Sequence, residues 1–367
     1  MSQLKCGLVG LPNVGKSTLF NILSGKQTAD AANFPFCTIE PNTGSVVVKD
    51  ERLDKLSKIN KSERTIPTTL EFVDIAGLIK GSSKGEGLGN KFLSNIRQTD
   101  AIIHVVRCFD SDDIIHVHGK IDPKDDTDVI ELELILSDLE LVEKILNTIA
   151  KKSRSDQSLT KSVDFLKKCS EHLSNEQPIR MMQMNDEEIE LLKTIDLITK
   201  MPVIYAANLS EDDILSPDDS QHFQTLKKIA KTQNATVLPF CAVLESEILQ
   251  LDVEERLEMF QELGIKESAI DSLIKHAFHT LGLITYITSG EKETRAWTIK
   301  DGTNAQEAAG KIHSDIQRGF IRAEVIKYND FVEHGSRNNV KKAGLISSEG
   351  KEYVVKDGDI ILFLHNT

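Results

Sequence analysis

The segment Gly10-Leu-Pro-Asn-Val-Gly-Lys-Ser17 has the residue types and spacing of a loop that binds nucleotide phosphates. It follows the apolar stretch Leu4–Val9, which predicts a strand, and precedes Ser17–Ser24, which predicts a helix. Glycines let backbone N–H groups close around phosphate oxygens, and the helix N-terminus adds positive potential. Lys16 then faces the β- and γ-phosphates as a candidate catalytic residue, and the Ser17 hydroxyl binds Mg²⁺. The candidate nucleotide-binding residues of this loop are Asn13, Val14, Gly15, Lys16, Ser17 and Thr18.

A second motif, Asp74-Ile-Ala-Gly77, ends the apolar stretch 70–73 and resembles the D-x-x-G switch of Ras-like GTPases. We expect the Asp74 carboxylate to hold Mg²⁺ through a water molecule. The Gly77 N–H is expected to reach the γ-phosphate, so Gly77 is a second candidate catalytic position. Thr38, in the loop between the two motifs, is the expected third Mg²⁺ ligand. Thr43 lies in the same stretch and remains an alternative.

Position 78 departs from the Ras-like pattern, in which a glutamine orients the attacking water. Leu78 cannot form that hydrogen bond, so hydrolysis must be slow or another group must position the water. His116 follows the strand predicted at 101–109 and is a candidate replacement, although a solvated loop histidine is the alternative. A K⁺ ion held by Asn13 is a further hypothesis for stabilising the developing charge.

The base-reading motif of GTPases, N-K-x-D, is also altered. The strand predicted at 203–207 ends in Asn208-Leu209-Ser-Glu211. The longer Glu211 side chain should lose the paired contact to guanine, and Leu209 could lie against either purine. Asn208 could accept from N6–H₂ of adenine and donate to N7. These residues predict that ATP is preferred over GTP. A helix cap without a ligand role is the alternative.

The composition is that of a globular protein with more than one domain. The chain has 367 residues, 40% of them hydrophobic and 28% charged, and no apolar run long enough to cross a bilayer. Five scattered cysteines without a Cys-x-x-Cys pair disfavour a disulfide framework or a zinc site, so we expect a reducing, cytoplasmic compartment. The net charge of −13 argues against broad wrapping of nucleic acid, but residues 281–367 carry 12 Lys+Arg against 12 Asp+Glu.

The order of predicted elements indicates an α/β protein with a mostly parallel sheet. Strands are expected at 45–48, 69–73, 101–109, 201–207 and 235–240, with helical stretches between them. Between 128 and 200 strands are absent from the pattern. Apolar residues there recur every three or four positions, which predicts an inserted helical hairpin with a coiled-coil seam. Its predicted seam residues are Leu132, Ile135, Leu139, Val142, Leu146 and Ile149. Amphipathic helices packed on the core are the alternative.

A third pattern begins after Gly282 and predicts a small α+β domain. Strands are expected at 286–288 and 295–299, and one helix is expected over 304–318. A hairpin of 352–355 with 360–364 is expected across Asp357-Gly358.

Together these motifs resemble the YchF/Obg-like ATPase family over almost the whole chain. The resemblance includes Asn33-Phe-Pro-Phe-Cys-Thr-Ile-Glu-Pro-Asn42, Gly85-Glu-Gly-Leu-Gly-Asn90 and Thr294-Arg-Ala-Trp-Thr-Ile299. It implies a G domain at 1–127 and 201–280, a coiled-coil insertion at 128–200 and a C-terminal TGS domain of β-grasp type at 281–367. It also implies ATP hydrolysis, ribosome association and stress-linked regulation of translation. Leu78 fits this family, and His116 matches a family histidine proposed to act in hydrolysis.

Three functions remain open at this point. The first is an ATPase switch that binds the ribosome and RNA, and the second is a conventional GTPase of ribosome assembly. The third is a nucleotide-gated binding module with incidental turnover. We expect a monomer without a membrane partner. Basic residues that could present the C-terminal domain to RNA phosphates are Lys311, Arg318, Arg322, Lys341 and Lys342.

Overall fold

The computed structural model describes residues 4–31, 42–75, 87–111, 120–152, 159–265 and 267–366. The chain forms two compact units, and each contains segments that are distant in sequence. The first comprises residues 1–26, 39–44 and 71–273, and the second comprises 27–38, 45–70 and 274–367.

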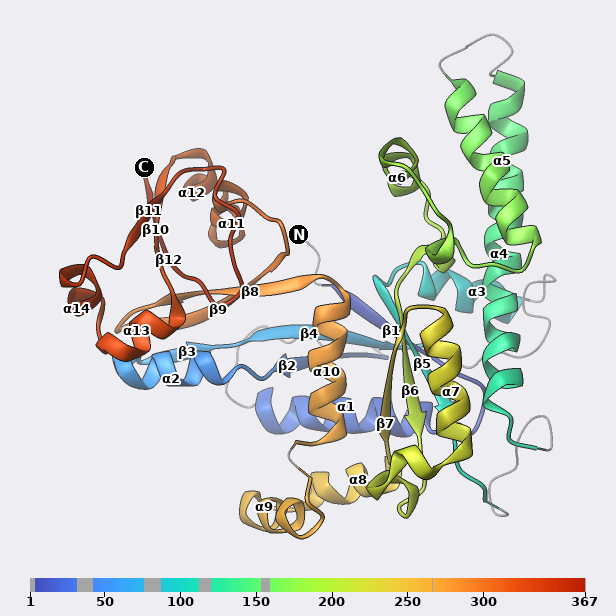
Figure 1. Ribbon diagram of the computed structural model, residues 1–367, viewed down its shortest axis with the longest axis horizontal. Helices are drawn as coiled ribbons and strands as arrows, with labels where there is room; N and C mark the ends of the chain where they lie inside the picture. Colours follow the sequence, from blue (N-terminus) through green and yellow to red (C-terminus); the bar gives the residue numbers. More distant parts are fainter. Residues whose placement is uncertain are drawn as a thin grey trace. The chain divides into compact units, whose positions relative to one another are not determined.

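The first sheet has the strand order β2-β4-β1-β5-β6-β7 (Figure 1). Its strands are β1 (Lys5–Val9), β2 (Thr43–Val48), β4 (Thr68–Asp74), β5 (Ala101–Arg107), β6 (Val203–Asn208) and β7 (Thr236–Phe240). All neighbouring pairs from β4 to β7 are parallel. Every residue of β5 and β6 is buried, as their mostly apolar sequences predict, and the polar His104, Arg107 and Asn208 are buried with the rest. Because parallel strands end at one edge, the segments after β1, β4, β5 and β6 meet there.

Helices lie between and after these strands along the chain, and some of them pack on the sheet. They are α1 (Lys16–Ala31), α3 (Gly87–Ile96), α4 (Pro123–Lys152), α5 (Thr160–Ser174), α6 (Asp186–Lys193), α7 (Gln221–Thr232), α8 (Ala242–Gln250), α9 (Val253–Glu262) and α10 (Ala269–Thr280). Helix α4 packs on β5, and α7 packs on β6 and β7.

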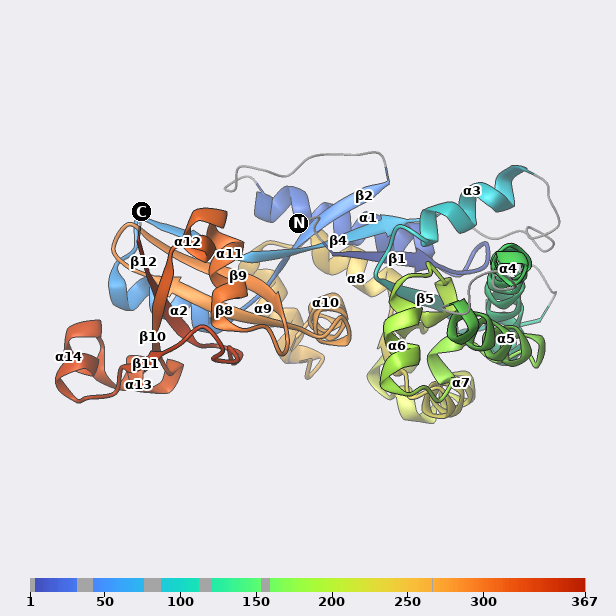
Figure 2. The ribbon, with the colours of Figure 1, turned by 90° about the horizontal axis from the view of Figure 1, so that it is seen from above.

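The predicted helical hairpin is formed by α4 and α5, which lie side by side in Figure 1 and Figure 2. Ile135 and Val142 of α4 are buried with Phe165 and Leu166 of α5, while Leu139, Leu146 and Ile149 pack against this cluster. Leu132 differs from the prediction because its side chain is 38% exposed and lies outside the seam.

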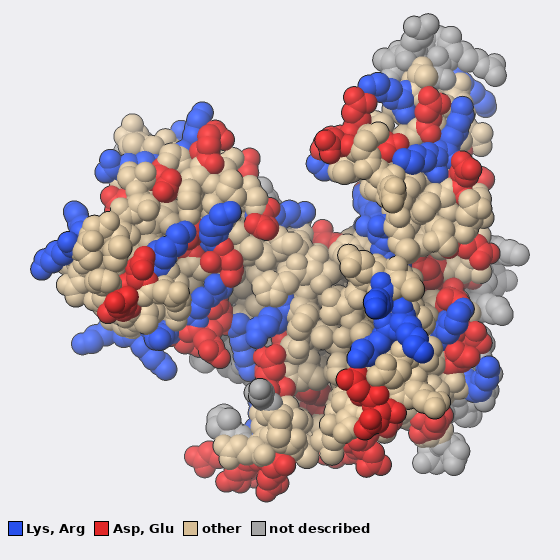
Figure 3. All heavy atoms as spheres, in the orientation of Figure 1, with Lys and Arg blue, Asp and Glu red and all other residues tan. Residues whose placement is uncertain are grey.

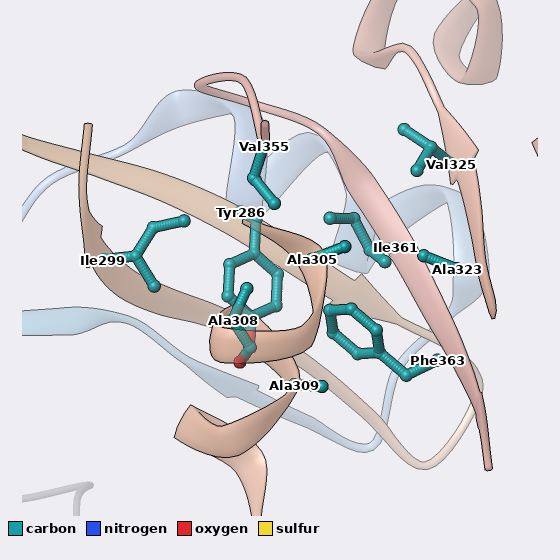
Figure 4. Packing of buried hydrophobic residues seen from close by; sticks show 10 residues of the cluster. All are labelled: Tyr286, Ile299, Ala305, Ala308, Ala309, Ala323, Val325, Val355, Ile361 and Phe363. Atoms are coloured by element: carbon teal, nitrogen blue, oxygen red, sulfur yellow. The ribbon is translucent and has the colours of Figure 1, made fainter. Parts of the chain in front are cut away.

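The second sheet has the order β11-β10-β12-β8-β9-β3 and mixes parallel and antiparallel pairs. Its strands are β3 (Arg64–Ile66), β8 (Leu283–Ser289), β9 (Glu293–Lys300), β10 (Phe320–Ile326), β11 (Ser347–Glu349) and β12 (Ile360–His365). On one face, Tyr286 and Phe363 meet Ala308 and Ala309 of α11 (Ala305–Ile312), as Figure 4 shows. The Tyr286 hydroxyl also donates a hydrogen bond of 2.9 Å to the Ala308 carbonyl.

A segment from the first part of the chain packs on the other face of the second sheet. Helix α2 (Glu51–Asn60) buries Leu53 and Leu56 against Ile287 and Ala296, together with α13 (Tyr328–His334). The following β3 pairs in parallel with β9. Residues 45–70, expected within the G domain, therefore share a compact unit with the C-terminal segment.

Two local predictions for the C-terminal segment are wrong. The helix expected over 304–318 breaks at His313, whose extended backbone (φ −161°, ψ 145°) separates α11 from α12 (Ser314–Arg318). The hairpin expected across Asp357-Gly358 does not form, because both edges of β12 are occupied by β10 and β8. Residues 352–355 instead contact the start of α11 through the bridge between Val354 and Asn304.

Candidate nucleotide-binding site

The loop between β1 and α1 has the backbone geometry that phosphate binding needs. Asn13 and Gly15 have positive φ angles of 64° and 95°. A Cβ atom on Gly15 would lie 2.4 Å from Asn208 Nδ2, and one on Gly10 would lie 2.7 Å from the Val105 carbonyl. Close approach therefore requires glycine at both positions, and at Gly15 the positive φ requires it as well. Helix α1 begins at Lys16 without an acidic residue in its first turn, so its N-terminal N–H groups keep their positive potential.

Lys16 and Asp74 form an ion pair at this edge of the sheet. Their side chains are 8% and 19% exposed, so the pair is largely shielded from solvent. Asp74 reaches this position because β4 runs parallel to β1 with Asp74 opposite Leu8. The structure thus brings together two predicted residues that are 58 positions apart.

Asn208 ties the phosphate-binding loop to the end of the sheet. Its Nδ2 donates to the Val14 carbonyl at 3.0 Å, and its Oδ1 accepts from the Ala242 N–H at 3.1 Å. One Nδ2 hydrogen remains for a ligand, and purine N7 is an acceptor in both adenine and guanine. Because Oδ1 already accepts from one backbone N–H, the expected bidentate reading of adenine would have to use its second lone pair, and it stays a prediction.

The other two base-reading candidates differ in their accessibility. Leu209 is only 1% exposed, so its side chain packs inside the protein, and its expected contact with a purine stays a prediction. Glu211 is exposed, and its charge acts on the Cys241 thiol, whose pKa is raised mainly by burial. Glu211 therefore lies close to the segment that carries Ala242.

Two family models match this sequence. One is YchF-GTPase_C, described as a protein of unknown function (DUF933), over residues 283–366, and the other is MMR_HSR1, described as a 50S ribosome-binding GTPase, over residues 5–157. The chain is 50% identical over 364 residues to the ribosome-binding ATPase YchF of Bacillus subtilis (strain 168), covering 99% of both chains. The protein of the same name from Escherichia coli O157:H7 is 49% identical over 363 residues, again covering 99% of both. The chain belongs to the YchF family.

A solved structure of the Schizosaccharomyces pombe YchF GTPase has the same fold. Its TM-score is 0.90 at 37% identity, and the match covers 99% of this chain and 98% of that one. The predicted YchF resemblance and fold class are confirmed: a Ras-like P-loop domain with an inserted helical hairpin, followed by a C-terminal α+β domain.

Several candidate residues lie outside the described part of the chain. They are Thr38, Gly77 and His116, together with Leu78. Thr43, the alternative to Thr38, is the first residue of β2. Ser17 and Thr18 are described, and both are exposed in the first turn of α1.

Sequence reasoning missed Arg107, which ends the otherwise apolar or aromatic β5 directly beside Asn208. Its side chain is 1% exposed, and its Nε donates to the Phe109 carbonyl at 3.0 Å. The guanidinium lies 4.6 Å from the centre of the Phe109 ring, and burial lowers its pKa. Arg107 therefore holds the turn after β5 next to the base-reading strand. The available signal was a single cation at the end of the stretch Ala101–Arg107.

The described donors suit Mg²⁺. Ser17 supplies a hydroxyl and Asp74 a carboxylate, and no group of three or more His, Cys, Asp or Glu side chains among the described residues is placed to hold a metal ion by itself. Mg²⁺ commonly binds one or two protein oxygens and completes its shell with water and phosphate oxygens. No helix within the described ranges is long and apolar enough to cross a membrane.

Proposed function

We propose that this YchF-family protein is a Mg²⁺-dependent ATP-hydrolysing switch that associates with the ribosome in the cytoplasm and modulates translation or its stress response. The observation that carries the proposal is the convergence of Lys16, Asp74 and Asn208 around a P-loop with the required backbone geometry. The names of the Bacillus subtilis and Escherichia coli relatives, ribosome-binding ATPases, support it.

The Lys16–Asp74 pair indicates how the site responds to nucleotide. When a triphosphate binds, Lys16 turns from Asp74 to the β- and γ-phosphate oxygens. The Ser17 hydroxyl and Asp74, the latter through a water molecule, are the groups that would hold Mg²⁺. Mg²⁺ would supply neutralising charge on the β- and γ-phosphates. Each charged group thus exchanges one partner of opposite sign for another, so neither remains unpaired in the shielded site.

A GTPase of ribosome assembly is the second candidate, and one observation favours it. The remaining Asn208 donor can serve N7 of either purine, so this hydrogen bond by itself does not select adenine. The solved relative from Schizosaccharomyces pombe is also named a GTPase. We retain ATP as the proposed substrate because Glu211 is one methylene longer than the aspartate that pairs with guanine.

The deciding experiment is a titration of ATP and GTP against the purified protein, followed by turnover measurements with and without ribosomes. We expect tighter ATP binding and slow turnover that ribosomes change. Lys16→Ala should lower kcat/KM on the order of a hundred-fold, about 2.7 kcal/mol of transition-state stabilisation. Lys5→Ala on β1, which removes a partly exposed lysine paired with Glu71 at 3.3 Å, is the matched control. Wild-type turnover in Lys16→Ala would exclude this site.

His116 and K⁺ remain proposals for the hydrolytic step. His116→Ala should slow turnover without changing nucleotide affinity, because a group acting only in the transition state affects the chemical step alone. Comparison of rates in K⁺ and Na⁺ buffers tests a K⁺ ion at Asn13, and equal rates would argue against it. Unchanged turnover in His116→Ala would mean that this histidine has no role in hydrolysis.

Ribosome association is proposed to involve the C-terminal α+β domain, which we interpret as a TGS domain acting in a monomer. Lys341 and Lys342 are both exposed in the last turn of α14 (Arg337–Lys342), whereas Arg318 is paired with Asp315. Deleting 281–367 is a poor test, because it would expose Leu53 and Leu56 of α2. The pair Lys341→Glu with Lys342→Glu should instead weaken ribosome co-sedimentation while leaving the fold intact. Unchanged co-sedimentation would place the contact elsewhere.

A further inference from the structure

A groove of about 550 Å³ runs along the last turns of α7 and the start of β7. It is lined by polar side chains, mainly Gln224, Lys227, Lys228, Lys231, Asn234 and Thr236. Asn234 has a φ of 51°, which turns the chain sharply from the helix into the strand. Strand β7 is the last strand of the first sheet, so the groove follows the sheet edge. We call this surface the α7–β7 groove.

The groove concentrates positive charge within an acidic chain. Lys228 and Lys231 are exposed and form no ion pair with any described residue, whereas Lys227 pairs with Asp218 at 2.6 Å. Figure 3 shows basic side chains gathered over the C-terminal part of α7, with acidic side chains below them. The whole chain has a net charge of −13, so its overall composition does not explain the positive charge of this groove.

The lining indicates a phosphate backbone as the partner. Residues three and four apart on a helix lie about 5–6 Å from each other, so Gln224, Lys228 and Lys231 form one row along the groove. Lysine ammonium groups, amides and hydroxyls are the groups that contact phosphate and sugar oxygens in nucleic-acid complexes. The amide of Asn234 and the hydroxyl of Thr236 extend this row toward β7.

A protein partner fits the groove poorly. Protein interfaces depend on buried aromatic or aliphatic anchors, and none of the large apolar side chains exposed in the described part of the chain lines this groove. Addition of a peptide strand to β7 is also hindered, because Pro239 removes a backbone donor from the five-residue edge strand.

We propose that the α7–β7 groove binds the phosphate backbone of RNA. On the ribosome it contacts ribosomal RNA through residues different from those proposed for the C-terminal domain. The choice of ribosomal RNA rests on the proposed function, whereas the preference for a phosphate backbone rests on the groove itself.

The test uses full-length protein with Lys228→Glu and Lys231→Glu combined. Its matched control combines Lys55→Glu and Lys58→Glu on α2, which have the same three-residue spacing and exposure. Lys58 and Lys231 both lie in the last turn of their helices, so the helix-dipole effect is matched as well. Binding is measured to purified ribosomes and to protein-free ribosomal RNA between 50 and 200 mM KCl, the range over which phosphate contacts change affinity most clearly.

We expect the groove variant to bind both probes about tenfold more weakly than the parent at the lower salt concentration, with a log–log salt slope smaller by about one to two. The control variant should bind like the parent. Equal binding by the two variants would overturn the proposal. Weaker binding to ribosomes but parental binding to protein-free RNA would also overturn it, and would indicate an acidic ribosomal protein instead. If the parent binds RNA through these lysines but does not bind ribosomes, the groove stands and the proposed ribosome function fails.

Discussion

The side-chain amide of Asn208 donates a hydrogen bond of 3.0 Å to the backbone carbonyl of Val14, a residue 194 positions earlier in the chain. This bond joins the end of β6 to the phosphate-binding loop. Because Asn208 is only 3% exposed and also accepts from the Ala242 N–H, it holds three segments of the site together. The same residue therefore supports the loop and offers one donor to a base.

Asn208→Ala should weaken ATP and GTP binding by the same factor. The substitution leaves the Val14 carbonyl and the Ala242 N–H without their partner, at a cost of about 1–3 kcal/mol for each buried group. The lost donor to N7 is common to both purines. Isothermal titration with each nucleotide, together with urea unfolding, measures the two effects. Asn208→Asp keeps an acceptor for Ala242 but loses the donor, and should bind both nucleotides as weakly. A selective loss of ATP alone would contradict this interpretation.

Glu211→Asp should shift the nucleotide preference toward GTP by about tenfold, because a restored bidentate pair is worth about 1–3 kcal/mol. The buried Leu209 is left unchanged in this test, since a lysine there would place a charge in the interior. The ratio of the ATP and GTP dissociation constants is the measurement. Asp212→Glu, at the exposed neighbouring position, controls for carboxylate length and should leave the ratio unchanged. A ratio that Glu211→Asp does not move would remove Glu211 from the base site.

Asp138 of α4 should be among the most important single residues for stability. Its fully buried carboxylate accepts from the Ile198 N–H at 3.0 Å and the Thr199 N–H at 2.7 Å, and Arg97 lies 3.3 Å away. Asp138→Ala should lower the free energy of unfolding by about 3–5 kcal/mol, because the buried donors of residues 198–199 and the half-buried guanidinium of Arg97 lose their partner. Denaturant unfolding measures the loss.

The control for Asp138 is Glu140→Ala on an exposed part of the same helix, which should change stability by less than about 0.5 kcal/mol. Asp138→Asn keeps one carbonyl acceptor and should fall between the two. Equal stability of Asp138→Ala and the parent would show that the bonds from α4 to residues 198–199 do not support the hairpin.

His104 should make the protein sensitive to mild acid. Burial lowers the pKa of its imidazole from 6.5 to about 3, and the nearby Arg180 adds to the effect. Below pH 6.5 the unfolded chain binds a proton that the folded protein does not, so stability falls as the pH falls from 6.5 toward 3. The slope from one such group approaches about 1.4 kcal/mol per pH unit.

His104→Gln should remove this contribution, so the difference in unfolding free energy between parent and variant should change between pH 6.5 and 5. His365→Gln, at an exposed residue that ends β12, should leave the slope as it is. Parallel curves for the parent and His104→Gln would mean that His104 accepts its proton normally in the folded state.

The strands of the first sheet and the P-loop residues were predictable because their signals are local. A glycine-rich turn with this lysine and serine, between an apolar strand and a helix, commonly binds nucleotide phosphates. Parallel strands then bring the segments that follow them to one edge of the sheet. The meeting of Lys16 with Asp74 therefore agrees with an inference from motifs alone. The helical hairpin was predictable for the same reason, since apolar residues recur every three or four positions along α4.

Tertiary structure decided which groups remain available to a ligand. The sequence by itself determined that Asn208, Leu209 and Glu211 follow a buried strand, but not that Oδ1 of Asn208 is occupied by Ala242 or that Leu209 is buried. The tertiary structure was also needed to show that β3 pairs with the free edge of β9 and that α2 packs on the second sheet. Hydrogen-bond partners and sheet edges are shared between distant segments, so they depend on what the rest of the chain brings to the same place.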